Sequence, residues 1–137
     1  MFSNSCKSGL NPLLLRLALA AIFVFHGLDL VAGPDNELGA KWNKADDAPP
    51  VHVQLAVAWG ELIGGVALGV GLLTRVAALG IIAIMAGAIA TVHLENGFDI
   101  RKGGYEYNMA IIVMCLCLVL GGPGPLSVDQ WFRSRRK

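Results

Sequence analysis

Hydrophobic residues along this chain gather into four long segments separated by shorter polar stretches. The segments cover approximately residues 13–32, 51–73, 76–94 and 105–121. An α-helix needs about 20 apolar residues to cross the hydrocarbon core of a membrane, and each segment is close to that length. Asn-Pro or Pro-Pro precedes the first two segments and Gly-Pro follows the first and the last, as expected at helix ends. The pattern predicts an all-α protein, a transmembrane four-helix bundle.

Polar residues inside the segments are too few for a soluble helix bundle, the main alternative. A soluble bundle needs a polar face on each helix, but Arg16 is the sole polar residue of 13–25 and Thr91 that of 76–92. The chain is 55% hydrophobic and 15% charged, whereas soluble domains average about 45–50% and about 25%. We therefore expect one membrane domain over residues 1–137, with the lipid bilayer as its partner. The net charge of +1 gives no sign of nucleic-acid binding.

The distribution of Lys and Arg predicts that both termini are cytoplasmic. With four spans, the terminal side carries seven of these residues: Lys7, Arg16, Arg75, Arg133, Arg135, Arg136 and Lys137. The other side carries four: Lys41, Lys44, Arg101 and Lys102. Positive charge accumulates on the cytoplasmic side. If the first segment were instead a cleaved signal peptide, three spans would remain and the basic tail would lie outside, against this rule.

The C-terminal residues predict a short interfacial helix. Ser127 and Gln130 have the spacing of a capping box. Trp131 and Phe132 are suited to the headgroup level, with the basic tail on anionic lipid. A disordered basic tail is the alternative.

Five polar residues inside the spans are candidates for function, because such groups are costly in a membrane. They are His26, Glu61, His93, Glu106 and Asn108. In the predicted orientation all five lie between mid-membrane and the outer surface. We expect them to share a polar pocket in the outer half, although helix packing alone is the alternative explanation. Arg16 lies on the inner side, where its side chain is expected to reach the headgroups.

Glu61 is the most specific of these signals because it falls near the middle of its span. A lone ionised carboxylate in hydrocarbon is penalised by several kcal/mol, so it must pair or remain protonated. Such a group suits proton transfer, with His26 or His93 as a partner; a structural salt bridge or hydrogen bond is the alternative. Small residues accompany these groups, which predicts closely packed helices. They are Gly65 and Gly69 on the Glu61 face, Gly60 and Gly64 beside it, and Ala86 and Ala90 on the His93 face.

Other redox and cofactor chemistries lack their motifs. Cys6, Cys115 and Cys117 form no Cys-x-x-Cys pair and none lies on the predicted outer side, which argues against thiol–disulfide exchange by this chain. P-loop, Rossmann and zinc-type spacings do not occur. We expect no metal site, although His26 and His93 with carboxylates leave one geometrically conceivable.

Several stretches, taken in order, resemble the DoxX family of small bacterial membrane proteins. They are residues 14–19, 25–27, 61–65, 71–75 and 103–108. The resemblance covers nearly the whole chain and implies a four-helix bundle in the bacterial cell inner membrane. Relatives in the family include membrane subunits of thiosulfate:quinone oxidoreductases. The family's matching polar positions here are Arg16, His26, Glu61, Glu106 and Asn108.

These observations favour an integral membrane subunit of an oxidoreductase system that binds a quinone or small redox substrate. Glu61 and His26 are the expected catalytic residues, and the expected binding residues are His93, Glu106, Asn108 and Arg16. Because the chain contains no soluble redox domain, electron transfer requires a partner redox protein or a bound quinone, and a homo-oligomer is a further expectation. Whether the chain is itself an enzyme stays open. The alternatives are a non-catalytic anchor or assembly partner and a small-solute transporter.

Overall fold

The computed structural model describes residues 9–136, and over that range all regular structure is helical. The long helices are α1 (Leu10–Ala32), α2 (Val51–Val70), α3 (Thr74–Ala88) and α4 (Glu106–Gly121), and α5 (Val128–Ser134) follows. Helix α3 continues through a π-helical turn, η3 (Ile89–His93), and a 3₁₀ turn, η4 (Leu94–Asn96). Two more 3₁₀ turns, η2 (Glu37–Gly39) and η5 (Ile100–Lys102), lie in the loops. The predicted all-α class is confirmed. Cys6, Lys7 and Lys137 fall outside the described residues.

Three of the helical segments are long and apolar enough to cross a membrane: Leu10–Ala32, Val51–Val70 and Thr74–Asn96. Helix α4 is also apolar but has only 16 residues, somewhat short of the about 20 that span a typical bilayer. The chain is thus a multi-pass membrane protein. The fourth span and the cytoplasmic position of the termini stay predictions.

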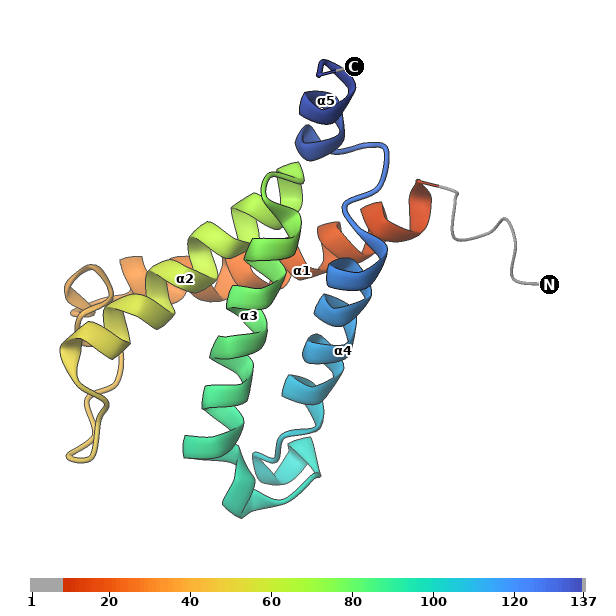
Figure 1. Ribbon diagram of the computed structural model, residues 1–137. Coiled ribbons are helices and arrows are strands. Elements are labelled where there is room, and N and C mark those ends of the chain that lie inside the picture. Colours follow the sequence, from red (N-terminus) through yellow and green to blue (C-terminus); the bar gives the residue numbers. More distant parts are fainter. Residues whose placement is uncertain (1–8, 137) are drawn as a thin grey trace.

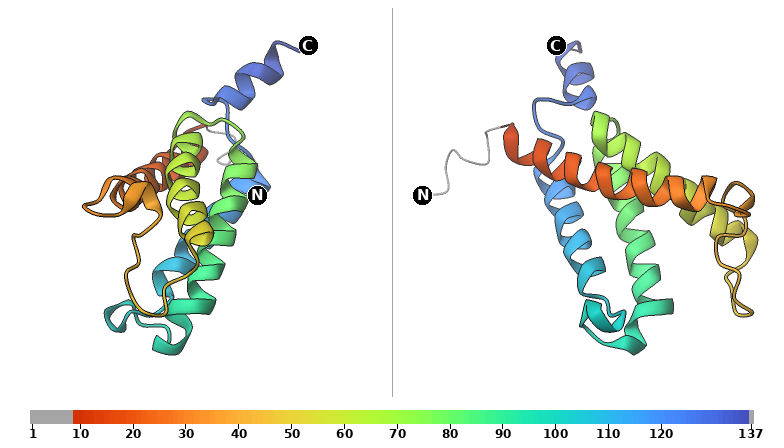
Figure 2. Two further views of the ribbon diagram at one scale, coloured as in Figure 1. Left: turned by 90° about the vertical axis from the view of Figure 1, so that its left-hand side faces the viewer. Right: turned by 180° about the vertical axis from the view of Figure 1, so that it is seen from behind.

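The four long helices form two antiparallel pairs, α1 with α2 and α3 with α4 (Figure 1). The pairs meet where the α2–α3 turn, the start of α1 and α5 lie, which we term the turn end. They diverge toward the opposite loop end, which carries the connections 33–50 and 94–105 (Figures 1 and 2). The hydrophobic core joins the pairs: Leu19, Phe23, Leu68, Ala78, Ile81, Met85, Ile111, Cys115 and Leu118.

Glycines bring α1 and α2 into backbone contact. A Cβ atom on Gly27 would lie 2.5 Å from the backbone nitrogen of Leu62, and one on Gly65 would lie 2.8 Å from that of Val24. On the neighbouring face of α2, a Cβ atom on Gly64 would lie 3.1 Å from a side-chain atom of α3. The close packing predicted around Glu61 is confirmed, and it fixes α2 between α1 and α3.

Arg16 joins the helices at the turn end. Its side chain is 1% exposed. Nε donates to the carbonyl oxygen of Leu68 at 2.8 Å and Nη2 donates to that of Gly69 at 2.9 Å. Nη1 donates to the carbonyl oxygens of Pro123 and Leu126, at 3.0 and 2.7 Å. The expectation that Arg16 reaches the headgroups was wrong: the last turn of α2 offers carbonyl groups without helical partners, and Arg16 binds two of them.

Helix α5 confirms the predicted helix and its cap. The hydroxyl of Ser127 accepts a hydrogen bond from the backbone N–H of Gln130 at 3.2 Å. The helix projects beyond the α2–α3 turn (Figure 1). Its location at a membrane interface stays a prediction.

Asp129 fastens α5 to the start of α3. Its carboxylate accepts hydrogen bonds from the backbone N–H groups of Leu73, at 2.7 Å, and Thr74, at 2.8 Å. The first turn of a helix favours an anion because its N–H groups point outward unpaired. Partial burial acts to raise the pKa of Asp129, but the hydrogen bonds from Thr74 and Leu73 outweigh burial, and the pKa lies below its ordinary value.

Candidate functional site

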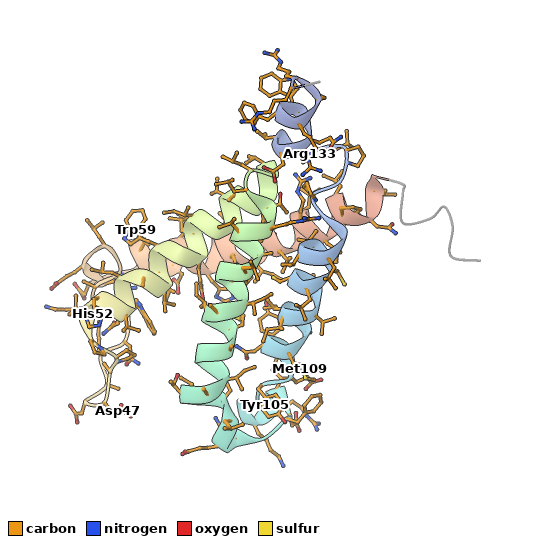
Figure 3. All side chains as sticks on the ribbon, viewed as in Figure 1. Asp47, His52, Trp59, Tyr105, Met109 and Arg133 are labelled. Atoms are coloured by element: carbon orange, nitrogen blue, oxygen red, sulfur yellow. The ribbon has the colours of Figure 1, made fainter. Side chains whose placement is uncertain are left out.

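A cavity of ≈ 1150 Å³ lies between the two helix pairs, where they diverge toward the loop end. All four long helices line it, and most of the lining side chains are apolar. The polar lining residues within the helices are His26, His52, Glu61, Thr91, His93, Tyr107 and Asn108. Asp47 and His52 line the cavity from the α1–α2 side, and Figure 3 shows both at the loop end of that pair.

Glu61 places a carboxylate against this cavity. The residue is 8% exposed and is held one turn before Gly65, where α2 touches α1. Within residues 9–136 the carboxylate has no hydrogen-bond or ion-pair partner. The expected pairing of Glu61 with His26 or His93 is therefore not present. Tyr107 on α4 lines the same cavity. The carboxylate is therefore free to bind a ligand in the cavity.

His26 and Asn108 line the cavity from α1 and α4. His26 is exposed, and its ring meets that of Phe25 edge to face, with centroids 5.5 Å apart. Asn108 is 6% exposed, and its Nδ2 donates to the sulfur of Met85 at 3.5 Å. A thioether is a weak acceptor, so within residues 9–136 most of the hydrogen-bonding capacity of the Asn108 amide is unused.

His93 lies at the rim in the loop-end part of the α3–α4 pair. Its Nδ1 lies 2.6 Å from the carbonyl oxygen of Gly103, and a carbonyl only accepts, so Nδ1 carries the proton. In the tautomer that carries this proton, Nε2 is left as the acceptor of the ring. The contact also fixes the α3–α4 connection.

The π-helical turn Ile89–His93 changes which residues accompany His93. The α-helical spacing placed it on one face with Ala86 and Ala90, but the cavity is lined by Gly87 and Ala88 together with His93. A π-turn adds one residue per turn and so rotates everything that follows it. The predicted Ala86–Ala90–His93 face was wrong for this reason.

Two predicted site residues lie elsewhere. Glu106 does not line the cavity; its Oε2 accepts from the backbone N–H of Ile100 at 3.1 Å, which ties η5 to the start of α4. Arg16 lies at the turn end, with its guanidinium occupied by backbone carbonyl groups. The structure thus brings four of the six candidates to one cavity: His26, Glu61, His93 and Asn108.

Sequence reasoning missed Tyr107 and Gln54. Tyr107 lies beside the predicted Asn108, and its phenol was not considered. Gln54 is 4% exposed; its Oε1 accepts from the backbone N–H of Asn43 and its Nε2 donates to the carbonyl oxygen of Pro49, both at 2.9 Å. Because Asn43 and Pro49 line the cavity, Gln54 holds the first loop in place as part of the cavity wall. A polar amide in the first turn of a span, two residues after His52, was the available signal.

Metal binding has no support in the part of the chain that the structure describes, where no group of three or more His, Cys, Asp or Glu side chains is placed to hold an ion.

The fold and the cavity define a multi-pass helical membrane protein with a mainly apolar chamber and a few ionisable groups in its wall. The chain belongs to the DoxX family, whose family model matches residues 11–94. A Haemophilus influenzae relative named "Uncharacterized protein" is 31% identical over 89% of this chain and 83% of its own length. A Bacillus subtilis relative named "Putative oxidoreductase CatD" is 30% identical over 93% of this chain and 91% of its own length. No solved structure matches the chain significantly.

Proposed function

We propose that this protein is an integral membrane subunit of an oxidoreductase system that binds a quinone or similar small redox substrate in the cavity. The observation that carries the proposal is the Glu61 carboxylate, which is 8% exposed and unpaired within the described residues beside a mainly apolar chamber. Ligand sites typically combine an apolar lining with a few polar groups that orient the ligand. The name of the Bacillus subtilis relative supports the redox class.

The groups around the cavity match the needs of a quinone. Reduction of a quinone adds electrons and protons to its carbonyl oxygens, and a protonated Glu61 supplies a proton at one of them. Tyr107 and Asn108 are hydrogen-bond donors on the opposite helix pair. Electrons come from a partner redox protein that docks on the chain.

The membrane topology is part of the same proposal. With α4 as a fourth span and both termini in the cytoplasm, the loop end faces the outer side of the bacterial inner membrane. Protons at Glu61 then exchange with the outer aqueous phase past His26 and His93, both of which line the cavity.

Native mass spectrometry of the protein extracted gently from its own membranes tests this function. We expect a stoichiometric quinone on the wild type, loss of it in Glu61→Gln, and retention in Glu106→Gln. The last variant is a matched control, because Glu106 carries the same side chain in a helix of the same bundle but lies outside the cavity. A wild-type protein that carries a second polypeptide and no small molecule would contradict the proposal and favour a non-catalytic anchor.

A further inference from the structure

The cavity is larger than a single redox ring requires. Pockets for drug-sized molecules measure about 300–1,000 Å³, and this cavity has ≈ 1150 Å³. The polar groups in its wall include Glu61 on α2 and Tyr107 and Asn108 on α4. The remaining wall along α3 is made of small and apolar residues, among them Ala83, Gly87 and Ala88.

The cavity opens between α2 and α3. The two helices touch where Gly64 packs on Ile81, and again one turn further toward the loop end, where a Cβ atom on Gly60 would lie 3.0 Å from Ile84. One turn beyond that contact, Ala56 of α2 and Gly87 of α3 are both exposed and both line the cavity. Figure 1 shows that α2 and α3 diverge with distance from their connecting turn. In a membrane this opening faces lipid rather than water, since both helices are apolar spans.

Two loops, each held by hydrogen bonds, lie at the aqueous end of the cavity. The first loop is held over α2 by Gln54 and by Trp59, whose Nε1 donates to the carbonyl oxygen of Leu38 at 3.0 Å. The second loop is held by the contact of His93 with Gly103. Both loops contribute lining residues at the loop end of the cavity, and a bulky apolar molecule that enters between α2 and α3 avoids them.

We propose that the cavity binds a redox ligand with a long apolar tail. The ligand enters from the bilayer between α2 and α3, and in the bound state its ring lies at Glu61 and its tail lies along Gly87. This inference rests on the proposed function and specifies its substrate class, a lipid-soluble tailed quinone rather than a small water-soluble one. Gly87 is then a specificity residue for the tail.

The open space at Gly87 allows a precise test. A Cβ atom there meets nothing within 4 Å, so Gly87→Phe attaches its ring at an open position beside the opening. Gly80→Phe is a matched control, because Gly80 lies two turns earlier on the same face of α3, also has open space, and does not line the cavity. Each variant is reconstituted in lipid nanodiscs. Binding is measured for ubiquinone with its isoprenoid tail and for a benzoquinone of the same ring substitution without a tail.

We expect Gly87→Phe to weaken tailed ubiquinone by about tenfold or more and the tail-less ring by less than about threefold. Gly80→Phe should leave both affinities unchanged, and Glu61→Gln should weaken both. An equal loss of both ligands, or no loss of either, in Gly87→Phe would refute the tail route while the Glu61 result still supports the function. If wild-type protein binds neither quinone, the proposed function fails and the tail route fails with it.

Discussion

Replacing Arg16 with Met should be among the most destabilising single substitutions in this protein. Methionine keeps an unbranched apolar stem but removes the guanidinium, which leaves four carbonyl groups without their donor, those of Leu68, Gly69, Pro123 and Leu126. A buried polar group left unpaired costs roughly 1–3 kcal/mol. Partial relaxation at the turn end reduces the sum, so we expect a loss of about 3–5 kcal/mol, the range for breaking a buried charged network. That is a large share of the about 5–15 kcal/mol that stabilises a typical protein.

Reversible unfolding in mixed micelles with increasing denaturing detergent, followed by tryptophan fluorescence, measures this loss. Arg16→Lys should fall between the wild type and Arg16→Met, because an ammonium group keeps the charge but cannot span carbonyl groups on two sides as a planar guanidinium does. Arg75→Met is the control, since Arg75 is an exposed arginine near the same end. An Arg16→Met protein within about 0.5 kcal/mol of wild type, the range of ordinary surface substitutions, would refute the assigned role.

Three further changes test other contacts. Asp129→Asn should cost about 0.5–2 kcal/mol as a lost helix cap. Because the pKa of Asp129 is lowered in the folded state, its contribution to stability is complete above the ordinary aspartate pKa. That contribution is lost as the pH falls through the pKa of Asp129 in the folded protein. Thermal melts across pH should therefore show less acid sensitivity in Asp129→Asn than in the wild type. Gly27→Val should cost about 3 kcal/mol or more by overpacking against α2, whereas Gly80→Val should be much milder in the same melts. Gln54→Ala should speed proteolysis within residues 33–50 relative to the wild type, and equal cleavage rates would contradict its role as a loop anchor.

The helices were predictable because long apolar runs and their Pro and Gly boundaries are local signals. The first predicted span, 13–32, corresponds to Leu10–Ala32, and the second, 51–73, to Val51–Val70. The second ends earlier because Gly71 adopts a left-handed conformation with φ 75° and stops the helix. The third, 76–94, was placed correctly, but its π-turn leaves no mark in the hydrophobic pattern.

The site was predictable only in part, because side-chain partners far apart in the chain are not encoded in local spacing. Depth in the membrane was enough to group His26, Glu61, His93 and Asn108, which do line one cavity. It could not show that Arg16 binds carbonyl groups 52 to 110 positions away. Membrane depth also could not show that the Glu106 carboxylate accepts a hydrogen bond from Ile100 in the preceding loop.

The central claim is that Glu61 exchanges a proton with a quinone bound in the cavity. Infrared difference spectroscopy of the reconstituted protein, as bound quinone is reduced and reoxidised at an electrode, observes that exchange directly in the carboxyl stretching region. We predict a carboxyl band that changes with the redox state in the wild type and in Glu106→Gln but is missing in Glu61→Gln. A spectrum in which this band persists in Glu61→Gln, or in which no carboxyl group responds while quinone is reduced, would contradict the account.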